Sequence, residues 1–225
     1  MSFDGINDYI YQDSTTGNNF NVTSASTWCF RVKFSNVSAT QSIINKNGDG
    51  LAGVGYNILL VAGKIRVIYR SGSTSNDLIL ESSFSFSIGV SYHVCITYDG
   101  SSSVSGFNVY VDTVASTIST IRDNLTGNIQ SAIDLEFGTG SGALAAILNV
   151  VRAWNIEFNT TQIAQDYNLG VPDFPIETAN LVVANDMGDG ASFTTLGTWV
   201  LPETADLPSC SLSANMDITD RVTAI

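Results

Sequence analysis

Short segments in which apolar and polar residues alternate recur along most of this 225-residue chain. Apolar or aromatic side chains occupy every second position of residues 28–34, 65–70, 92–98 and 107–112. Because successive side chains of a strand point to opposite faces, each segment predicts a β-strand with one buried face. Turns rich in Gly, Asn and Asp separate the segments. The pattern predicts an all-β protein, folded as a two-sheet antiparallel sandwich or jelly roll.

One stretch, residues 159–170, carries the signals of a short helix. Asn159 can cap its N-terminus, and Gln162 three residues later can hydrogen-bond back to the capping residue. Gly170, followed closely by proline, is typical of the end of a helix.

The chain changes character after this helix, since all four prolines lie beyond residue 170. We therefore expect a folded domain over residues 1–170. Residues 171–225 are expected to form a Pro-containing C-terminal extension, with one further strand near residues 180–184.

The two ends of the predicted domain, residues 3–10 and 150–154, both have the character of strands. In a sandwich of this kind the first and last strands usually lie side by side, so we expect these two segments to pair. The N-terminal segment lacks the basic and apolar regions of a secretory signal peptide, so none is expected.

Charge and hydropathy exclude two classes of partner. The 21 acidic residues outnumber the 9 basic ones and give a net charge of −12, which would repel nucleic acid and anionic membrane surfaces. No apolar run approaches the ~20 residues of a membrane-spanning helix. Only 13% of the residues are charged, and a surface made polar by Ser, Thr, Asn and Gly also suits packing among subunits.

The three cysteines, Cys29, Cys95 and Cys210, have no Cys-x-x-Cys spacing, so they indicate neither a zinc site nor a disulfide framework. Cys29 and Cys95 fall inside predicted strands, where a free thiol usually acts as a small apolar residue. The sequence leaves open one disulfide between two of the three.

The order of the predicted strands resembles that of the laminin-G-like, or concanavalin A-like, jelly-roll family. The resemblance covers residues 1–170 and rests on Phe-Asp-Gly-x-x-Asp-Tyr-Ile at 3–10, Trp-x-Phe-x-Val-Lys at 28–33, Ser-Tyr-His-Val-x-Ile-Thr-Tyr-Asp-Gly at 91–100 and Val-Val-Arg-Ala-Trp at 150–154. Residues 186–193 and 211–217 are similar to segments that accompany such jelly rolls in structural proteins of tailed bacteriophages.

The resemblance suggests a calcium site and a sugar-binding surface. Some laminin-G-like modules hold Ca²⁺ at the rim, where Asp4 and Asp8 could serve as ligands. Against this, Leu148 and Asn149 stand where many relatives carry an acidic pair. Outward-facing tyrosines could contact a glycan or a protein partner, and the candidates are Tyr56, Tyr69 and Tyr110, although core packing is the default for aromatic residues.

Two features that suggest catalysis are better explained as structural. Laminarinase-type glycosidases of the same superfamily carry Glu-x-Asp-x-Glu on one strand, but the nucleophile position of that motif is Ala132 in this chain. Asp134 and Glu136 are then expected to be solvent-facing acids. His93 matches the family's strand histidine, and because no nucleophile motif accompanies it, we expect a structural role. The protein is predicted not to be an enzyme and to need no cofactor, calcium excepted.

The leading functional hypothesis is a structural protein of a tailed phage, either a capsid decoration or a tail or fibre component. It would be made in the host cytoplasm, act at the virion surface, form homo-oligomers and dock to other virion proteins through the extension. The alternative is a stand-alone carbohydrate-binding module, which overlaps with the first because virion jelly rolls often bind host glycans. A glycosidase is a distant third hypothesis.

Overall fold

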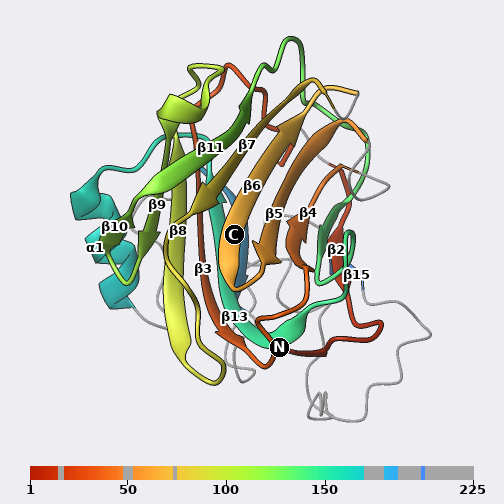
Figure 1. Cartoon of the computed structure of the whole chain (residues 1–225), viewed down its shortest axis with the longest axis vertical. Helices are drawn as coiled ribbons and strands as arrows, with labels where there is room; N and C mark the ends of the chain where they lie inside the picture. Colours follow the sequence, from red (N-terminus) through yellow and green to blue (C-terminus); the bar gives the residue numbers. More distant parts are fainter. Residues whose placement is uncertain (15–17, 48–52, 73–74, 170–179, 187–198, 201–225) are drawn as a thin grey trace, which may run out of the picture.

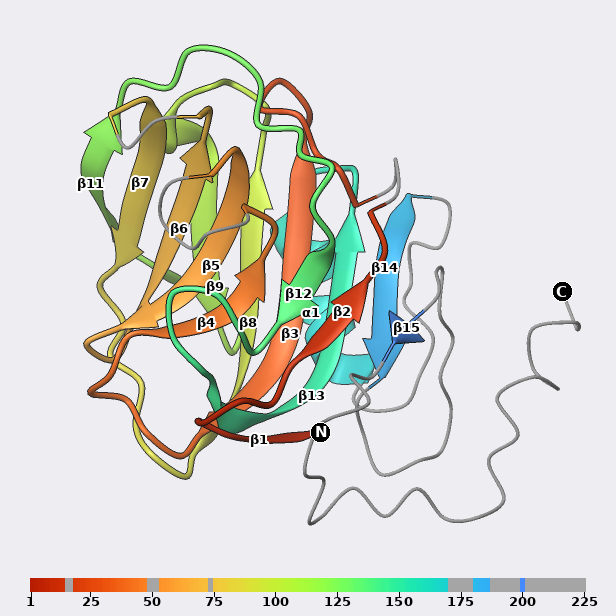
Figure 2. The same cartoon turned by 90° about the vertical axis from the view of Figure 1, so that its right-hand side faces the viewer.

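The protein is a sandwich of two antiparallel sheets (Figures 1 and 2). The computed structural model describes residues 1–14, 18–47, 53–72, 75–169, 180–186 and 199–200. The seven-stranded sheet contains, in order, β1 (Ser2–Asp4), β13 (Ala145–Trp154), β3 (Ser26–Phe34), β8 (Ser91–Tyr98), β9 (Phe107–Val111) and β10 (Val114–Ser116), and β14 (Leu181–Asp186) also pairs with β13. The eight-stranded sheet contains β11 (Ile118–Asp123), β7 (Asp77–Ser82), β6 (Lys64–Arg70), β5 (Gly55–Val61), β4 (Gln41–Asn45), β12 (Leu135–Phe137), β2 (Ile10–Gln12) and β15 (Trp199–Val200). The predicted all-β jelly-roll class is confirmed.

The core lies between the sheets and is filled by the alternate residues that the sequence pattern predicts. Aromatic rings are prominent there: Tyr98 stacks on Phe107 with ring centroids 4.2 Å apart, and Tyr69 meets Phe107 edge-on at 5.0 Å. Ring contacts of this kind stabilise the core beyond the area they bury.

The expectation that Tyr56 and Tyr69 face outward is wrong, because both rings are buried in this core. The Tyr56 hydroxyl donates to the Asn18 carbonyl at 2.8 Å, and the Tyr69 hydroxyl lies 3.4 Å from the Ser26 hydroxyl. Burial raises the pKa of both tyrosines. Neither ring is available to a glycan.

The first and last strands of the jelly roll lie side by side, as predicted, because β1 pairs with β13 (Figure 2). The pairing joins residues 2–4 to residues 145–147, however, and the predicted segment 150–154 pairs with β3 and β14 instead. The opening segment is nevertheless not one strand. It divides into β1 and β2, which belong to different sheets. Gly5 lies between them at φ +85°, and Asp4 Oδ1 accepts a hydrogen bond from the Ile6 amide at 2.7 Å. This turn lets the chain cross from one sheet to the other.

The predicted helix is present as α1 (Thr160–Leu169), and a 3₁₀ turn spans Val104–Gly106. The Asn159 side chain accepts from the Gln162 amide and the Gln162 side chain accepts from the Asn159 amide, both at 3.0 Å, so the predicted capping box is formed. Helix α1 covers the outer face of the seven-stranded sheet (Figure 1). None of the helices in the described residues is long and apolar enough to cross a bilayer.

Two described parts of the C-terminal extension belong to the sheets. The predicted strand near residues 180–184 is β14, which pairs with β13, while β15 pairs with β2 at the edge of the other sheet. Val183 is fully buried in the main core. The rest of the extension, including Cys210, lies outside the described residues, so docking through it stays a prediction.

Candidate functional site

A row of side chains on the outer face of the eight-stranded sheet combines aromatic and hydrogen-bonding groups. In the strand register Glu136 of β12 lies opposite Tyr11 of β2 on one side and opposite Asn45 of β4 on the other. The neighbours of Glu136 in the strand, Leu135 and Phe137, are buried in the core, so Glu136 points outward. We call the group Tyr9, Tyr11, Asn45 and Glu136 the β12 patch.

The Glu136 carboxylate is half-buried and held in place by Asn45. The Asn45 Nδ2 group donates to Glu136 Oε2 at 2.7 Å. Burial raises the pKa of Glu136, and the hydrogen bond from Asn45 opposes this effect. Gly140 lies beside the pair, where an added Cβ atom would come within 2.9 Å of the Ser42 hydroxyl and 3.0 Å of Asn45. The loop can therefore approach the sheet here only because this residue lacks a side chain.

Tyr9 and Tyr11 supply aromatic surface next to the carboxylate. Their rings stack with centroids 6.4 Å apart and planes inclined by 28°. Both rings are partly exposed. A partly exposed ring beside a fixed carboxylate can pack against an apolar face of a ligand while the carboxylate accepts hydrogen bonds from it.

Lys46 comes directly after β4, next to Asn45 of the patch, and is buried. Its ammonium group donates to the Ser14 hydroxyl at 3.0 Å and to the Ile133 carbonyl. Burial lowers the pKa of Lys46 to about 8, and the nearby charge of Asp134 opposes this effect. Nothing in the sequence pattern indicates a buried lysine here.

The free energy of unfolding is expected to rise with pH between about pH 8 and pH 10.5, the pKa values of Lys46 in the folded and unfolded chain. In this window the unfolded chain keeps the Lys46 proton while the folded chain has released it, so raising the pH disfavours unfolding. Urea unfolding at several pH values should show a smaller rise for Lys46→Met than for the wild type. Lys64→Met, which alters a more exposed lysine, should keep the wild-type slope; equal slopes in all three proteins would contradict the assignment.

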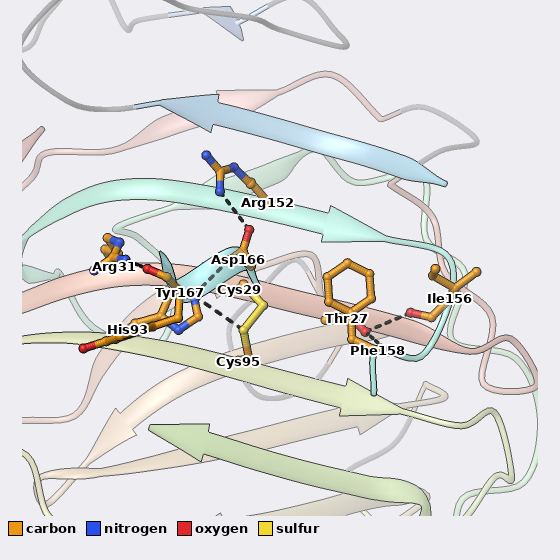
Figure 3. Close-up of a disulfide and its surroundings, with 10 residues drawn as sticks. All are labelled: Thr27, Cys29, Arg31, His93, Cys95, Arg152, Ile156, Phe158, Asp166 and Tyr167. Atoms are coloured by element: carbon orange, nitrogen blue, oxygen red, sulfur yellow. Dashed lines mark hydrogen bonds and ion pairs between the residues drawn. A yellow bond between two sulfur atoms is a disulfide. The ribbon is translucent and has the colours of Figure 1, made fainter. Parts of the chain in front are cut away.

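A second group of chemically active side chains lies beneath helix α1 (Figure 3). Arg152, Cys29, Cys95 and Tyr110 occupy one row across β13, β3, β8 and β9. Cys29 and Cys95 form a disulfide between directly opposed residues of β3 and β8. The sequence left open whether two of the three cysteines form a disulfide, and the structure pairs Cys29 with Cys95, because the register places their side chains together on the same face.

His93 and Asp166 complete this group. The His93 Nε2 atom lies 2.9 Å from Asp166 Oδ2 and 3.7 Å from Cys95 Sγ. Arg152 donates to Asp166 Oδ1 at 2.8 Å. Burial disfavours the charged form of Asp166, but the hydrogen bonds from His93 and Arg152 lower its pKa overall. We call Cys29, His93, Cys95 and Asp166 the helix-covered cluster.

Two tyrosines flank the helix-covered cluster. Tyr110 is partly buried and packs against the apolar side chains beneath the helix, so its predicted outward position holds only in part. Tyr167 of the helix meets the His93 ring edge-on at 5.5 Å, and the Arg31 guanidinium lies 5.3 Å from the Tyr167 ring.

The remaining predicted residues lie elsewhere. Asp4 and Asp8 meet in the turn after β1, where Asp8 Oδ2 accepts from the Asp4 amide at 2.9 Å. Calcium binding by these two residues stays a prediction.

Strand β12 begins at Leu135, so Ala132 and Asp134 precede it instead of sharing its face, and Asp134 Oδ1 accepts from the Ser14 amide at 2.9 Å.

The jelly roll matches the model of a known protein family. A laminin-G-type family model described as the concanavalin A-like lectin/glucanases superfamily matches residues 4–164. The chain belongs to this superfamily. The match runs from β1 into α1 and confirms the family predicted from the order of the strands. A comparison with functionally curated proteins found no match.

Solved structures with the same fold are distant in sequence. A native heptameric SAP-like pentraxin from Limulus polyphemus aligns with a TM-score of 0.59 and 14% identity over 89% of this chain and 90% of the pentraxin. A Bacteroides ovatus protein named "putative carbohydrate binding protein" aligns at 0.61 and 14% identity over 90% of this chain and 60% of that protein. The binding domain of botulinum neurotoxin serotype D aligns at 0.55 and 18% identity, over 76% of this chain and 42% of the domain.

Sequence patterns did not reveal either group of side chains as a unit. The β12 patch combines three strands, and the helix-covered cluster joins residues up to 137 positions apart, from Cys29 to Asp166. Alternation shows which residues share a face of one strand but not which strands are neighbours. The Asn-x-x-Gln capping motif predicted where the helix begins, but not the sheet face against which the helix packs.

Proposed function

We propose that this protein is a non-catalytic carbohydrate-binding module that contacts sugar through the β12 patch. The observation that carries the proposal is the partly exposed Tyr11 ring beside the half-buried Glu136 carboxylate. A tyrosine ring can pack against the C–H face of a sugar, and a carboxylate accepts strong hydrogen bonds from hydroxyl groups. Because Asn45 already holds Glu136, little side-chain order would have to be gained on binding.

The description of the superfamily and the names of solved structures with the same fold support this choice. They include a protein named for carbohydrate binding and a toxin binding domain. Because a fold does not determine a function, the evidence for sugar binding rests on the side chains of the patch.

The arrangement around β12 favours binding over hydrolysis. Retaining glycosidases need a carboxylate nucleophile about 5–5.5 Å from a carboxylic acid. The nucleophile position suggested by the superfamily motif is Ala132, and Asp134 precedes the strand and accepts a backbone hydrogen bond. Release of sugar from any β-glucan by the purified protein would overturn the non-catalytic part of the proposal.

Screening the purified full chain on a glycan array should identify a ligand, whose affinity is then measured by calorimetry. Tyr11→Ala and Glu136→Gln should each weaken binding at least about tenfold, the loss expected when a stacking ring or a charged hydrogen-bond acceptor is removed. Matched controls are Tyr167→Ala on the helix and Glu81→Gln on β7, and both should keep wild-type affinity. Equal losses in patch and control variants would contradict the placement of the site.

The sequence further predicts that this module belongs to a tailed-phage virion, where it would display its sugar-binding face at the particle surface. The relatives give closer support to carbohydrate binding itself, so virion membership remains a separate hypothesis. Mass spectrometry of purified particles from a source phage would test it. Absence of the chain from those particles would remove the virion role and leave the binding module.

A further inference from the structure

We infer that the helix-covered cluster binds a zinc ion when Cys29 and Cys95 are reduced. The cluster offers two sulfur atoms, one imidazole nitrogen and one carboxylate oxygen, and these ligand atoms all lie within 4.8 Å of one another. All of its side chains are buried. The site is on the outer face of the seven-stranded sheet and is independent of the β12 patch, which lies on the other sheet.

The donor set and its dimensions suit zinc. Zn²⁺ prefers four ligands in a tetrahedron, with Cys, His and Asp among its usual ligands, and bond lengths of about 2.0–2.3 Å place neighbouring ligand atoms about 3.3–3.8 Å apart. The His93 Nε2 atom lies 3.7 Å from Cys95 Sγ and 2.9 Å from Asp166 Oδ2. Only small shifts are needed to reach tetrahedral spacing around a central ion.

The two sulfur ligands come from directly opposed strand positions. The Cα atoms of Cys29 and Cys95 are 4.1 Å apart, and both side chains project toward helix α1. Once the disulfide is broken, rotation about the Cα–Cβ bonds can separate the sulfur atoms to the tetrahedral spacing without moving the backbone. Asp166 reaches the same point from the helix, so the ion would join β3, β8 and α1.

The charges of such a site would balance. Two thiolates and the Asp166 carboxylate carry three negative charges, and the zinc ion with the Arg152 guanidinium carries three positive charges. Arg152 already donates to Asp166 Oδ1, which leaves Oδ2 directed toward His93 and the sulfur atoms. A buried site with no net charge avoids the penalty of an uncompensated charge.

Zinc and the disulfide exclude each other because both use the same sulfur atoms. Two molecules of a small thiol reduce the disulfide, forming two Cys thiols and one thiol-derived disulfide. Binding of one Zn²⁺ then releases the two thiol protons. In the reverse direction a small disulfide oxidises the two thiolates, is itself reduced to two thiolates, and frees the ion.

The test uses the full chain carrying Cys210→Ser, so that the only sulfhydryl groups are those of the cluster. Zinc content is measured after dialysis of the reduced and the oxidised protein against a zinc buffer. Reduced protein should retain about one zinc ion per chain, and oxidised protein at least about tenfold less. With Co²⁺ as a probe, the reduced protein should show sulfur-to-cobalt charge transfer and the visible bands of tetrahedral cobalt.

Asp166→Asn and Cys29→Ser should each weaken zinc retention at least about tenfold, whereas Glu157→Gln, an acid near the helix but outside the cluster, should not. If a cluster variant fails to fold, the cobalt spectrum of the reduced parent protein still decides the matter. Failure of the reduced protein to take up stoichiometric zinc, or a cobalt spectrum without sulfur ligation, would overturn the inference. Neither result would affect sugar binding by the β12 patch.

Discussion

Asp77→Ala should lower the free energy of unfolding by about 3–5 kcal/mol, because it removes the carboxylate that neutralises a buried arginine. Asp77 is fully buried, and its Oδ2 atom accepts from Arg70 Nη2 at 2.6 Å. Arg122 donates to the Asp77 Oδ1 atom at 2.8 Å. The side chain of Arg70 is also buried, so water cannot readily replace the lost partner.

Glu81→Ala provides the matched control on the same strand. Glu81 pairs with Arg66 of β6 as Asp77 pairs with Arg70, but the side-chain exposure is 18% for Glu81 and 31% for Arg66, against 0% and 4% for the Asp77 pair. Exposed ion pairs contribute about 0–1 kcal/mol. Guanidinium chloride unfolding of the two variants should therefore separate them clearly, and similar losses would show that burial does not govern these pairs.

Phe3→Ala is the second substitution with a large expected effect, again about 3–5 kcal/mol of lost stability. Phe3 is 2% exposed, belongs to the main core and lies opposite Ala146 in the pairing of β1 with β13. Truncating the ring leaves a cavity where the first strand closes the sandwich. Thermal and denaturant unfolding both measure the loss.

Ile6→Ala is the control for the N-terminal segment, because Ile6 is 76% exposed and its truncation should change stability by no more than about 0.5 kcal/mol. Deleting residues 1–10 should be more damaging than Phe3→Ala, since it also removes the backbone pairing of β1. If Phe3→Ala were as mild as Ile6→Ala, the first strand would not be an integral part of the core.

Much of the jelly roll could be predicted because several of its strands, such as β3, β8 and β9, alternate apolar and polar residues. Val94 and Ile96 of β8 follow the period of two and are buried as expected. The helix could be predicted for a different reason, since Asn159 and Gln162 form a local hydrogen-bonded motif that needs no knowledge of distant residues.

Features that depend on tertiary neighbours could not be predicted in the same way. Tyr56 was expected to face outward because alternation in one strand does not reveal which face meets the other sheet. The Cys29–Cys95 disulfide depends on the register between β3 and β8, which no single-strand pattern encodes. The structural role expected for His93 stays a prediction, and its partner Asp166, 73 residues away on a helix, could not be foreseen from the strand pattern.

Nuclear magnetic resonance can locate the sugar on the protein and so test binding at the β12 patch. The strongest array ligand is titrated into isotope-labelled protein, and the backbone amide shifts are mapped onto the sequence. We expect the largest shifts on residues of β2, β4 and β12 around Tyr11, Asn45 and Glu136. In Glu136→Gln the same shifts should require at least about tenfold more ligand. Shifts concentrated at the Asp4–Asp8 turn or beneath helix α1, with the patch unchanged, would show that sugar binds elsewhere.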